Sequence, residues 1–437
     1  MSQASHVILN LNPIPGGIYA SGWRTGYRDP ASFITVEHYV ELAKIAERGH
    51  LDALFLADTA SWSPVAGSRT FRPLDPTVSL PYIAAHTSHL GLIATVSTTY
   101  NTPYNLARRL LSLDHVSGGR AAWNVVVTAG DEQARNSSLP AAPPKQERYA
   151  RAREFVEIVR QLWHSWEDGA IVADAESGVY IDATKVRPIH YQGDHFQVAG
   201  PLIVPPSPQH HPVIIQAGGS EGGTDLAGRY ANAVYSTQPT QDGARAYREE
   251  LRRRAAHHGR SPDTIKLLPG LVTIIGSTEE EAQRRARDLL ERIPVSPGLA
   301  RLSTFVELPP EVLATGLDEP LPWHQIPAEA LNGVGHSATV LRTAKENHYT
   351  VRDILHEINS VREHATITGT PEQVADKIET WFRSGAVDGF NIMPAELPLG
   401  AEQFVDHVVP LLQQRGLFRT EYTTKTLRGH YGLSHHD

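Results

Sequence analysis

The chain has 437 residues, with 40 basic residues against 48 acidic ones, and its formal net charge is −8. It contains no cysteine, which excludes disulfides, thiolate or iron–sulfur metal ligands and a cysteine nucleophile. The negative charge argues against nucleic acid or an anionic membrane as the main partner, because both need a basic face. The first eleven residues lack the basic and apolar regions of a signal peptide, and no apolar stretch approaches the ~18 residues of a membrane span. We therefore expect a cytoplasmic protein.

Short apolar runs rich in β-branched residues recur along the whole chain. Some of them, such as Ala53–Ala57 and Pro212–Ile215, are apolar without interruption, which is typical of strands covered on both faces. We predict strands at His6–Asn12, Leu51–Asp58, Leu90–Ser97, Arg120–Thr128, Pro212–Gly218, Asn232–Gln238, Ile265–Ile275 and Gly389–Pro394.

Helical periodicity follows most of these runs. Ile34–Arg48 and Arg148–Trp166 place apolar residues on one face, and Thr370-Pro371 opens a third helix that stops at Gly385. Eight strands alternating with helices predict an α/β fold, a (β/α)₈ TIM barrel with insertions, rather than an open doubly wound sheet.

Two segments do not fit the alternation of strands and helices. We interpret both as insertions in a single domain spanning residues 1–437. Residues 169–211 are rich in Gly, Pro and His, with expected hairpin strands around Val179–Ile181 and His195–Val198; an interdomain linker is the alternative. Residues 293–364 are polar, proline-studded and partly helical. The C-terminal tail, residues 416–437, is expected to wrap the barrel.

Function in such a barrel gathers at the carboxyl ends of the strands. Neutral hydrogen-bonding groups and one carboxylate occupy the predicted ends: Asn12, Asp58, Thr95, Ser97, Asn124, Thr128, Gln216, Ser236, Gln238 and Asn391. Such a set suits a planar heterocycle with carbonyl and N–H edges. The same set suits a metal ion poorly. The side chains of the adjacent pairs His210-His211 and His257-His258 point in different directions, so we predict no metal site.

A glycine-rich turn, Gln216–Gly223, joins a predicted strand to a predicted helix around Thr224–Tyr230. Glycines allow close backbone approach, a helix N-terminus offers unpaired N–H groups, and Ser220 adds a hydroxyl. The spacing matches neither a Walker loop nor a G-x-G-x-x-G fingerprint. The turn is either a phosphate cradle or a plain tight turn.

Three further residues have two readings each. Asp58 at the end of its strand would contact a ligand or cap the next helix. Tyr100 would wall a pocket or pack on a neighbour, and Trp23, beside Arg24 in a glycine-flanked loop, would form a lid or pack within the loop.

Several segments, taken in order, resemble one family. They are Leu51–Asp58, Leu113–Val126 (LDHVSGGRAAWNVV), Arg148–Ala152, Gly200–Pro205, Gly389–Ile392 and Phe418–Tyr422. The chain resembles the nitrilotriacetate monooxygenase component A and dibenzothiophene-sulfone monooxygenase family of bacterial-luciferase-like flavin-dependent monooxygenases. The resemblance covers nearly the whole chain and is poorest before Gly369.

The resemblance implies an enzyme that receives reduced FMN from a separate NAD(P)H-dependent flavin reductase and oxygenates a small organic substrate with molecular oxygen. Polyaminocarboxylates, sulfones and other heteroatom-containing compounds are the substrates that it implies. It also implies a homodimer or homotetramer.

Positions carried over from the family assign the cofactor contacts. Asp58 and Thr95 would contact the flavin, and Asn124 would line the ring pocket. Tyr149, Gly219 and Ser220 would hold the ribityl phosphate. Lys145 stands where the family has histidine, a cation that still suits phosphate, and Gly219 stands where the family often has serine.

No catalytic residue is assigned, and Trp23 and Tyr100 are the candidate substrate-pocket residues. Three alternative functions stay open from the residues. A deazaflavin-dependent oxidoreductase would use the same barrel without oxygen. A glycoside hydrolase would pair Asp58 with Glu396 across the cavity. A catalytically silent flavin-binding or substrate-binding protein is the third.

Overall fold

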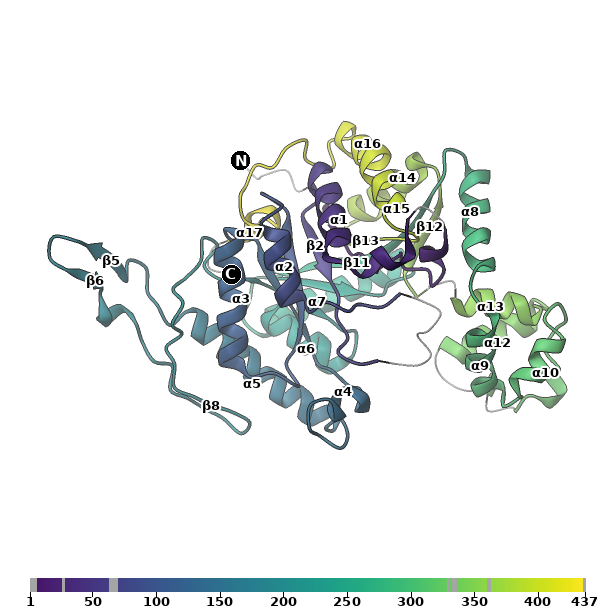
Figure 1. Ribbon diagram of the computed structural model, residues 1–437, viewed down its shortest axis with the longest axis horizontal. Coiled ribbons are helices and arrows are strands. Elements are labelled where there is room, and N and C mark those ends of the chain that lie inside the picture. The colour runs from purple at the N-terminus through teal and green to yellow at the C-terminus, as the bar shows by residue number, and fades with distance from the viewer. Residues whose placement is uncertain are drawn as a thin grey trace.

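The computed structural model describes residues 6–25, 28–62, 70–327, 330–331, 336–359 and 363–434. Eight parallel strands close into a barrel in the neighbour order β1–β2–β3–β4–β9–β10–β11–β13, with β13 pairing back to β1 (Figure 1). The barrel strands are β1 (Ile8–Leu11), β2 (Ala53–Leu56), β3 (Gly91–Ser97), β4 (Ala121–Val126), β9 (Val213–Ala217), β10 (Ala233–Ser236), β11 (Lys266–Ile275) and β13 (Gly389–Pro394). The predicted TIM barrel and all of its predicted strands are confirmed.

Helices cover the outside of the barrel. They are α1 (Val36–Arg48), α2 (Pro76–Ala84), α3 (Pro103–Ser117), α4 (Asp131–Arg135), α5 (Lys145–Trp163), α6 (Glu221–Tyr230), α7 (Gln241–His257), α8 (Glu279–Glu291), α14 (Pro371–Arg383), α15 (Leu399–Gln403), the π-helical turn η7 (Phe404–Val408) and α16 (Val409–Gln414). Helix α14 begins as predicted: Thr370 and Gln373 form a reciprocal capping box and Pro371 takes the first helical position.

Strand alternation explains why the apolar runs are continuous. In β2, Ala53 and Phe55 belong to the apolar cluster inside the barrel, whereas Leu54 and Leu56 pack outward under the helices. Both faces are therefore buried, and a parallel strand in this position has no polar face to show.

One strand of the barrel sheet was not predicted. β12 (Ala365–Gly369) lies outside the closed ring and pairs in parallel with Leu271–Ile275, the second half of β11. β11 is long enough to pair with β10 through Lys266–Pro269 and with β12 beyond it. β12 has only five residues and is followed at once by Thr370, the cap of α14. Its apolar stretch is therefore too short to indicate a strand in the sequence.

The two insertions project from opposite sides of the barrel (Figure 1). The first carries two hairpins, β5 (Ile171–Asp174) with β6 (Val179–Ile181) and β7 (Tyr191–Gln192) with β8 (Gln197–Val198). The second forms a helical lobe with its own apolar cluster: α9 (Val295–Val306), α10 (Pro310–Thr315), η6 (Trp323–Gln325), α12 (His336–Glu346) and α13 (Val351–Asn359). Parts of this lobe and the last three residues of the tail lie outside the described residues. We propose that both are insertions within one domain.

The C-terminal tail closes the amino-terminal end of the barrel. The short helix α17 (Leu427–His430) and the residues after it place Leu427 and Tyr431 in the cluster inside the barrel. The Tyr431 hydroxyl donates to Asn10 Oδ1 at 2.9 Å, and Arg419 pairs with the fully buried Asp52. The tail thus fills this end as well as wrapping it, and the carboxyl ends of the strands are left to form a site.

Candidate active site

A cavity of about 560 Å³ lies at the carboxyl ends of the strands. Its strand-borne lining includes Phe55, Thr95, Asn124, Val126, Ala217, Tyr235 and Met393, and residues following the strands include Asn12, Ala57 and Asp58. Its volume falls in the range of small-molecule sites. The barrel therefore places a ligand-sized hollow where enzymes of this fold carry their chemistry.

Neutral amides and hydroxyls line part of this cavity, as predicted. Thr95 and Asn124 are paired across β3 and β4, and Asn124 Nδ2 donates to Thr95 Oγ1 at 2.9 Å. This bond holds the amide while Asn124 Oδ1 stays buried with no hydrogen-bond partner among the described residues. Asn12 Oδ1 is buried and unpaired in the same sense. Two orphaned acceptors in the cavity lining call for N–H donors on a ligand.

Asp58 lines the same cavity, directly after β2. Burial raises the pKa of its carboxyl, and nearby Asp75 adds to the rise, while the Thr59 backbone N–H and Arg72 oppose it. Its carboxylate is thus a partly desolvated acceptor at the rim, with Arg72 also in the lining.

A second group of predicted residues meets at the N-terminus of α6. Tyr149 on α5 lies with its hydroxyl 2.9 Å from Ser220 Oγ. Gly222 permits this approach, because a Cβ there would stand 3.0 Å from Tyr149 Cγ. Ala217 lines the cavity and Gly219 follows two residues later in the chain, but Tyr149, Gly219 and Ser220 are not among the described residues that line the cavity.

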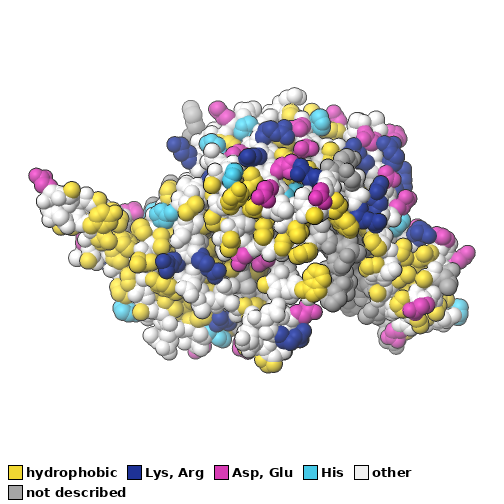
Figure 2. Space-filling view, viewed as in Figure 1, with side chains coloured by type: hydrophobic (Ala, Val, Ile, Leu, Met, Phe, Trp, Pro, Cys, Tyr) yellow, Lys and Arg dark blue, Asp and Glu magenta, His cyan; other side chains and the backbone are white. Residues whose placement is uncertain are grey.

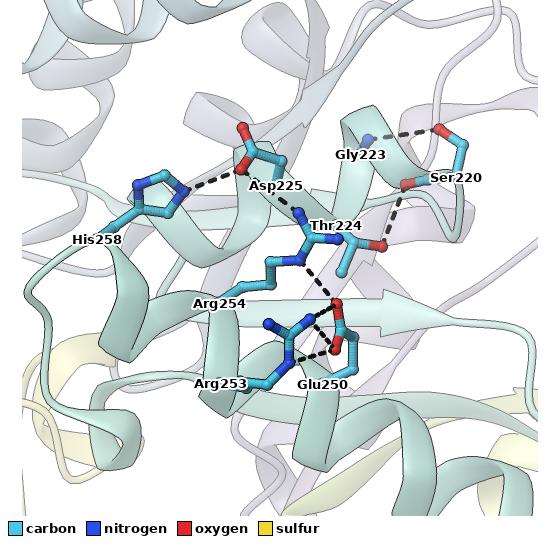
Figure 3. A network of polar contacts seen from close by, with 8 residues as sticks. All are labelled: Ser220, Gly223, Thr224, Asp225, Glu250, Arg253, Arg254 and His258. Carbon is cyan, nitrogen blue, oxygen red and sulfur yellow. Dashed lines mark hydrogen bonds and ion pairs between the residues drawn. The ribbon is translucent and has the colours of Figure 1, made fainter.

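Ser220 caps α6, and ion pairs join this helix to α7 (Figure 3). Ser220 Oγ accepts from the Gly223 backbone N–H at 3.4 Å, and Thr224 Oγ1 donates to the Ser220 carbonyl at 3.1 Å. A network links α6 to α7 through Asp225, His258, Arg254, Glu250 and Arg253. The terminus is therefore a fixed set of donors, the arrangement that suits an anion.

The remaining predicted residues do not line the cavity. Lys145 is exposed at the first position of α5, one turn before Tyr149. Tyr100 lies in a separate groove beside α3, where its hydroxyl is 3.5 Å from the Gly130 carbonyl. Trp23, in the 3₁₀ turn η1 (Gly22–Arg24), lies against Gly16, where a Cβ would stand 2.9 Å from Trp23 Cβ. Neither aromatic residue is among the described residues that line the cavity.

Three of the lining residues that were not predicted lie together, namely Tyr235, His364 and Met393. The Tyr235 hydroxyl lies 3.5 Å from His364 Nε2 and 3.6 Å from Met393 Sδ. Gly270 leaves the room for them, because a Cβ there would stand 2.6 Å from His364 Nδ1 and 2.7 Å from Met393 Sδ. Phe55 meets the Tyr235 ring edge-on at 5.7 Å, which fixes its direction.

Burial raises the pKa of Tyr235 and lowers that of His364, so both are neutral at pH 7. His364 is the one histidine among the described residues of the lining, and its Nδ1 is buried without a hydrogen-bond partner there. Because alternate residues of a strand point to the same face, the position of Tyr235 in β10 could have indicated that its side chain points into the barrel. His364 offered no such signal, since it follows an insertion and precedes the unpredicted β12.

The carboxylate pair of a glycoside hydrolase is not assembled in the part of the chain that the structure describes. Glu396 is buried outside the cavity lining, and burial raises its pKa against the effects of Thr25, Arg285 and Arg292. No group of three or more His, Asp or Glu side chains with metal-binding geometry occurs among the described residues.

A closed parallel barrel with a ligand-sized cavity at the carboxyl ends of its strands is the architecture of a TIM-barrel enzyme. The chain belongs to the luciferase-like monooxygenase family, whose pattern matches residues 14–388. It is accordingly an oxygen-incorporating oxidoreductase.

Full-length relatives agree with the resemblance found in the sequence. The chain is 41% identical to N-acetyl-S-(2-succino)cysteine monooxygenase of Bacillus subtilis, covering 99% of this chain and 98% of the relative. It is 39% identical to nitrilotriacetate monooxygenase component A of Aminobacter aminovorans, covering 96% and 94%. Among solved structures, a riboflavin lyase with modified FMN and riboflavin aligns with a TM-score of 0.81 and 30% identity, covering 98% of this chain and 96% of that one.

Proposed function

We propose that the chain is the oxygenase component of a two-component FMN-dependent monooxygenase. It takes reduced FMN from a separate NAD(P)H-dependent flavin reductase and uses molecular oxygen to oxygenate a small organic substrate. Two observations together carry the proposal: the orphaned Asn12 and Asn124 oxygens in the cavity lining, and the Tyr149–Ser220 contact at the N-terminus of α6, the helix that follows the cavity-lining strand β9. A planar ring with N–H edges and a phosphate tail fits both parts at once.

Each residue then has a defined task. Ser220, Tyr149 and the N–H groups of the first turn of α6 hold the phosphate, with Lys145 one turn away as an exposed cation. Asn124, held by Thr95, accepts from the ring. When bound, reduced FMN would supply the electrons that activate dioxygen, and the protein would supply orientation and a dry wall.

The cavity also indicates where a substrate lies. Trp62 and Phe71 meet edge-on at 5.8 Å in the lining, and Arg72 lies beside them with Asp58. An arginine next to aromatic walls suits an organic anion. We propose a substrate that carries carboxylates around a central nitrogen or sulfur; a sulfone is the uncharged alternative.

Self-association as a homodimer or homotetramer and a cytoplasmic location complete the proposal. No helix in the described part of the chain has the length and apolarity to cross a membrane. The net charge of −8 leaves the binding of an anionic cofactor to the local donors at α6 rather than to a general field.

Isotopically labelled dioxygen tests this function. The protein is supplied with FMN, NADH and a generic flavin reductase, with nitrilotriacetate, N-acetyl-S-(2-succino)cysteine or dibenzothiophene sulfone in separate reactions. We expect one labelled oxygen atom in the product of at least one of these, with less hydrogen peroxide than in the reaction without substrate. Oxygen uptake that ends wholly in peroxide with all three would contradict the proposed substrate class. Failure to bind reduced FMN at micromolar concentration would remove the proposed function itself.

A further inference from the structure

Two polar side chains of the cavity lining, those of Tyr235 and His364, face each other and leave one ring nitrogen unused. The Tyr235 hydroxyl lies 3.5 Å from His364 Nε2, and the two ring centroids are 6.1 Å apart. His364 Nδ1 is buried and has no hydrogen-bond partner among the described residues. It lies against Gly270, where a Cβ would stand 2.6 Å away, so this strand residue brings no side chain to pair with it. Tyr235 is therefore the side chain to which this imidazole bonds.

The position of the imidazole proton decides what the Tyr235 hydroxyl can do. Burial lowers the pKa of His364, so the ring is neutral at pH 7 and carries one N–H. With the proton on Nδ1, a buried N–H would lack an acceptor, and the Tyr235 hydroxyl would be used as the donor to Nε2. With the proton on Nε2, the N–H donates to the Tyr235 oxygen. Because a buried N–H without an acceptor is costly and rare, the surroundings favour the second tautomer, which leaves the hydroxyl proton free.

The free proton of Tyr235 is available to a bound molecule. Apart from His364 Nε2, the polar neighbour of the hydroxyl among the described residues is Met393 Sδ at 3.6 Å, which is a weak acceptor. Phe55 meets the Tyr235 ring edge-on at 5.7 Å and holds it in place. All of these side chains line the cavity, so the hydroxyl is a fixed donor at the wall of the ligand site.

A positive charge acts on the same part of the cavity. Burial raises the pKa of Tyr235, and Arg72 is near enough to oppose that rise electrostatically. Arg72 also lines the cavity. A hydroxyl donor and a guanidinium together suit a negatively charged oxygen, such as that of a carboxylate. The unpaired Asn12 and Asn124 oxygens are acceptors, so the cavity offers acceptors for ring N–H groups and, separately, donors for an oxygen anion.

We propose that Tyr235 donates its hydroxyl proton to a carboxylate oxygen of the substrate, and that His364 is the positioning residue that holds the Tyr235 oxygen for this bond. The inference rests on the proposed function and deepens it by naming residues that select a carboxylate-bearing substrate. Hydrogen bonds of an enzyme site are often long before the ligand binds, and the 3.5 Å contact should shorten in the complex.

Tyr235→Phe removes the hydroxyl alone and is the primary test. The probe is nitrilotriacetate or N-acetyl-S-(2-succino)cysteine, whichever the wild type oxygenates, and labelled product gives KM and kcat in the presence of FMN, NADH and flavin reductase. KM should rise about tenfold or more, because a hydrogen bond to a charged oxygen is lost. The change should appear mainly in KM rather than in kcat, because the bond orients the substrate before the reaction. The dissociation constant of reduced FMN, from anaerobic titration, should stay unchanged.

Two replacements of His364 separate positioning from packing. Glutamine keeps an N–H donor close to the place of Nε2, whereas leucine fills the space without a donor. His364→Leu should therefore raise KM severalfold, and His364→Gln should keep most of the wild-type affinity. In the Tyr235→Phe background neither change should raise KM further, because no hydroxyl oxygen remains to be held.

The matched control is Tyr180→Phe, which removes the same hydroxyl group far from the cavity. Tyr180 is 68% exposed on the β5–β6 hairpin, which Figure 2 shows as an arm rich in apolar side chains that projects from the body of the molecule. Its KM and kcat should equal those of the wild type. Circular dichroism checks that each variant is folded.

The results that would overturn the inference differ in what else they remove. A wild type that does not bind reduced FMN removes the proposed function and the inference with it. A wild type that oxygenates only dibenzothiophene sulfone, which has no carboxylate, removes the inference and leaves the proposed function standing. The same holds if Tyr235→Phe leaves KM unchanged or weakens FMN binding instead, or if His364→Leu acts equally in both backgrounds.

Discussion

Gly219 is the position where one added hydroxyl should tighten cofactor binding. Its φ does not fall in the left-handed region, and a Cβ there would meet no atom within 4 Å. Gly219→Ser therefore adds a side chain without backbone strain or a clash. The residue precedes the Ser220 cap and its partner Tyr149, so the new hydroxyl would stand beside the proposed phosphate.

The size of the effect follows from one hydrogen bond to a charged group, which contributes about 1.5–3 kcal/mol. Gly219→Ser should thus lower the dissociation constant of FMN by about tenfold or more. Quenching of flavin fluorescence measures this for oxidised FMN, and anaerobic titration measures it for reduced FMN. Gly219→Ala is the matched control, since it adds the methyl group without the hydroxyl.

Riboflavin, which lacks the phosphate, is the second control and should bind both variants as it binds the wild type. If Gly219→Ser and Gly219→Ala bind FMN alike, or if riboflavin gains as much as FMN, the phosphate does not lie at this terminus.

Three other changes test the site and the stability of the barrel. Gly222→Ala pushes a methyl group against Tyr149 at 3.0 Å and should weaken FMN binding about tenfold while leaving riboflavin binding unchanged, as the same titration measures. Burial lowers the pKa of His38 from 6.5 to about 4, so as the pH falls the imidazole is protonated in the unfolded chain before it is protonated in the folded one. The free energy of unfolding should therefore fall by roughly 3 kcal/mol as the pH is lowered from 6.5 to 4. His38→Leu should remove this part of the pH dependence, as urea titrations measure. Asp52→Asn leaves a buried arginine without its carboxylate and should cost about 3–5 kcal/mol in the same titrations, whereas Asp406→Asn, in an exposed ion pair, should cost about 1 kcal/mol or less. Equal losses from the two asparagine variants would contradict the burial argument.

The barrel was predictable because its strands are buried on both faces. In the run Leu51–Asp58 the five residues Ala53–Ala57 are continuously apolar, and the structure makes only Ala53–Leu56 a strand. The apolar pattern therefore locates a strand but overstates its length. β12 escaped because a strand outside the closed ring, with a half-buried face, needs no continuous apolar run.

Residues of the site could be predicted only where they lie at the ends of predicted strands or at positions that match the family's motifs. Thr95 and Asn124 converge because the carboxyl ends of parallel strands meet at one edge. The Tyr149–Ser220 contact joins residues 71 positions apart, and no spacing rule predicts that; the resemblance did. His364 enters the cavity from the end of an insertion, so only the folded chain shows it beside Tyr235.

Anaerobic titration with reduced FMN and with reduced riboflavin is the most direct test of the proposed cofactor site. The wild type should bind reduced FMN at micromolar concentration and at least about tenfold more tightly than reduced riboflavin, because the phosphate adds charge-assisted hydrogen bonds at α6. Ser220→Ala should remove most of that difference. Equal binding of the two flavins by the wild type, or an unchanged preference in Ser220→Ala, would contradict the account.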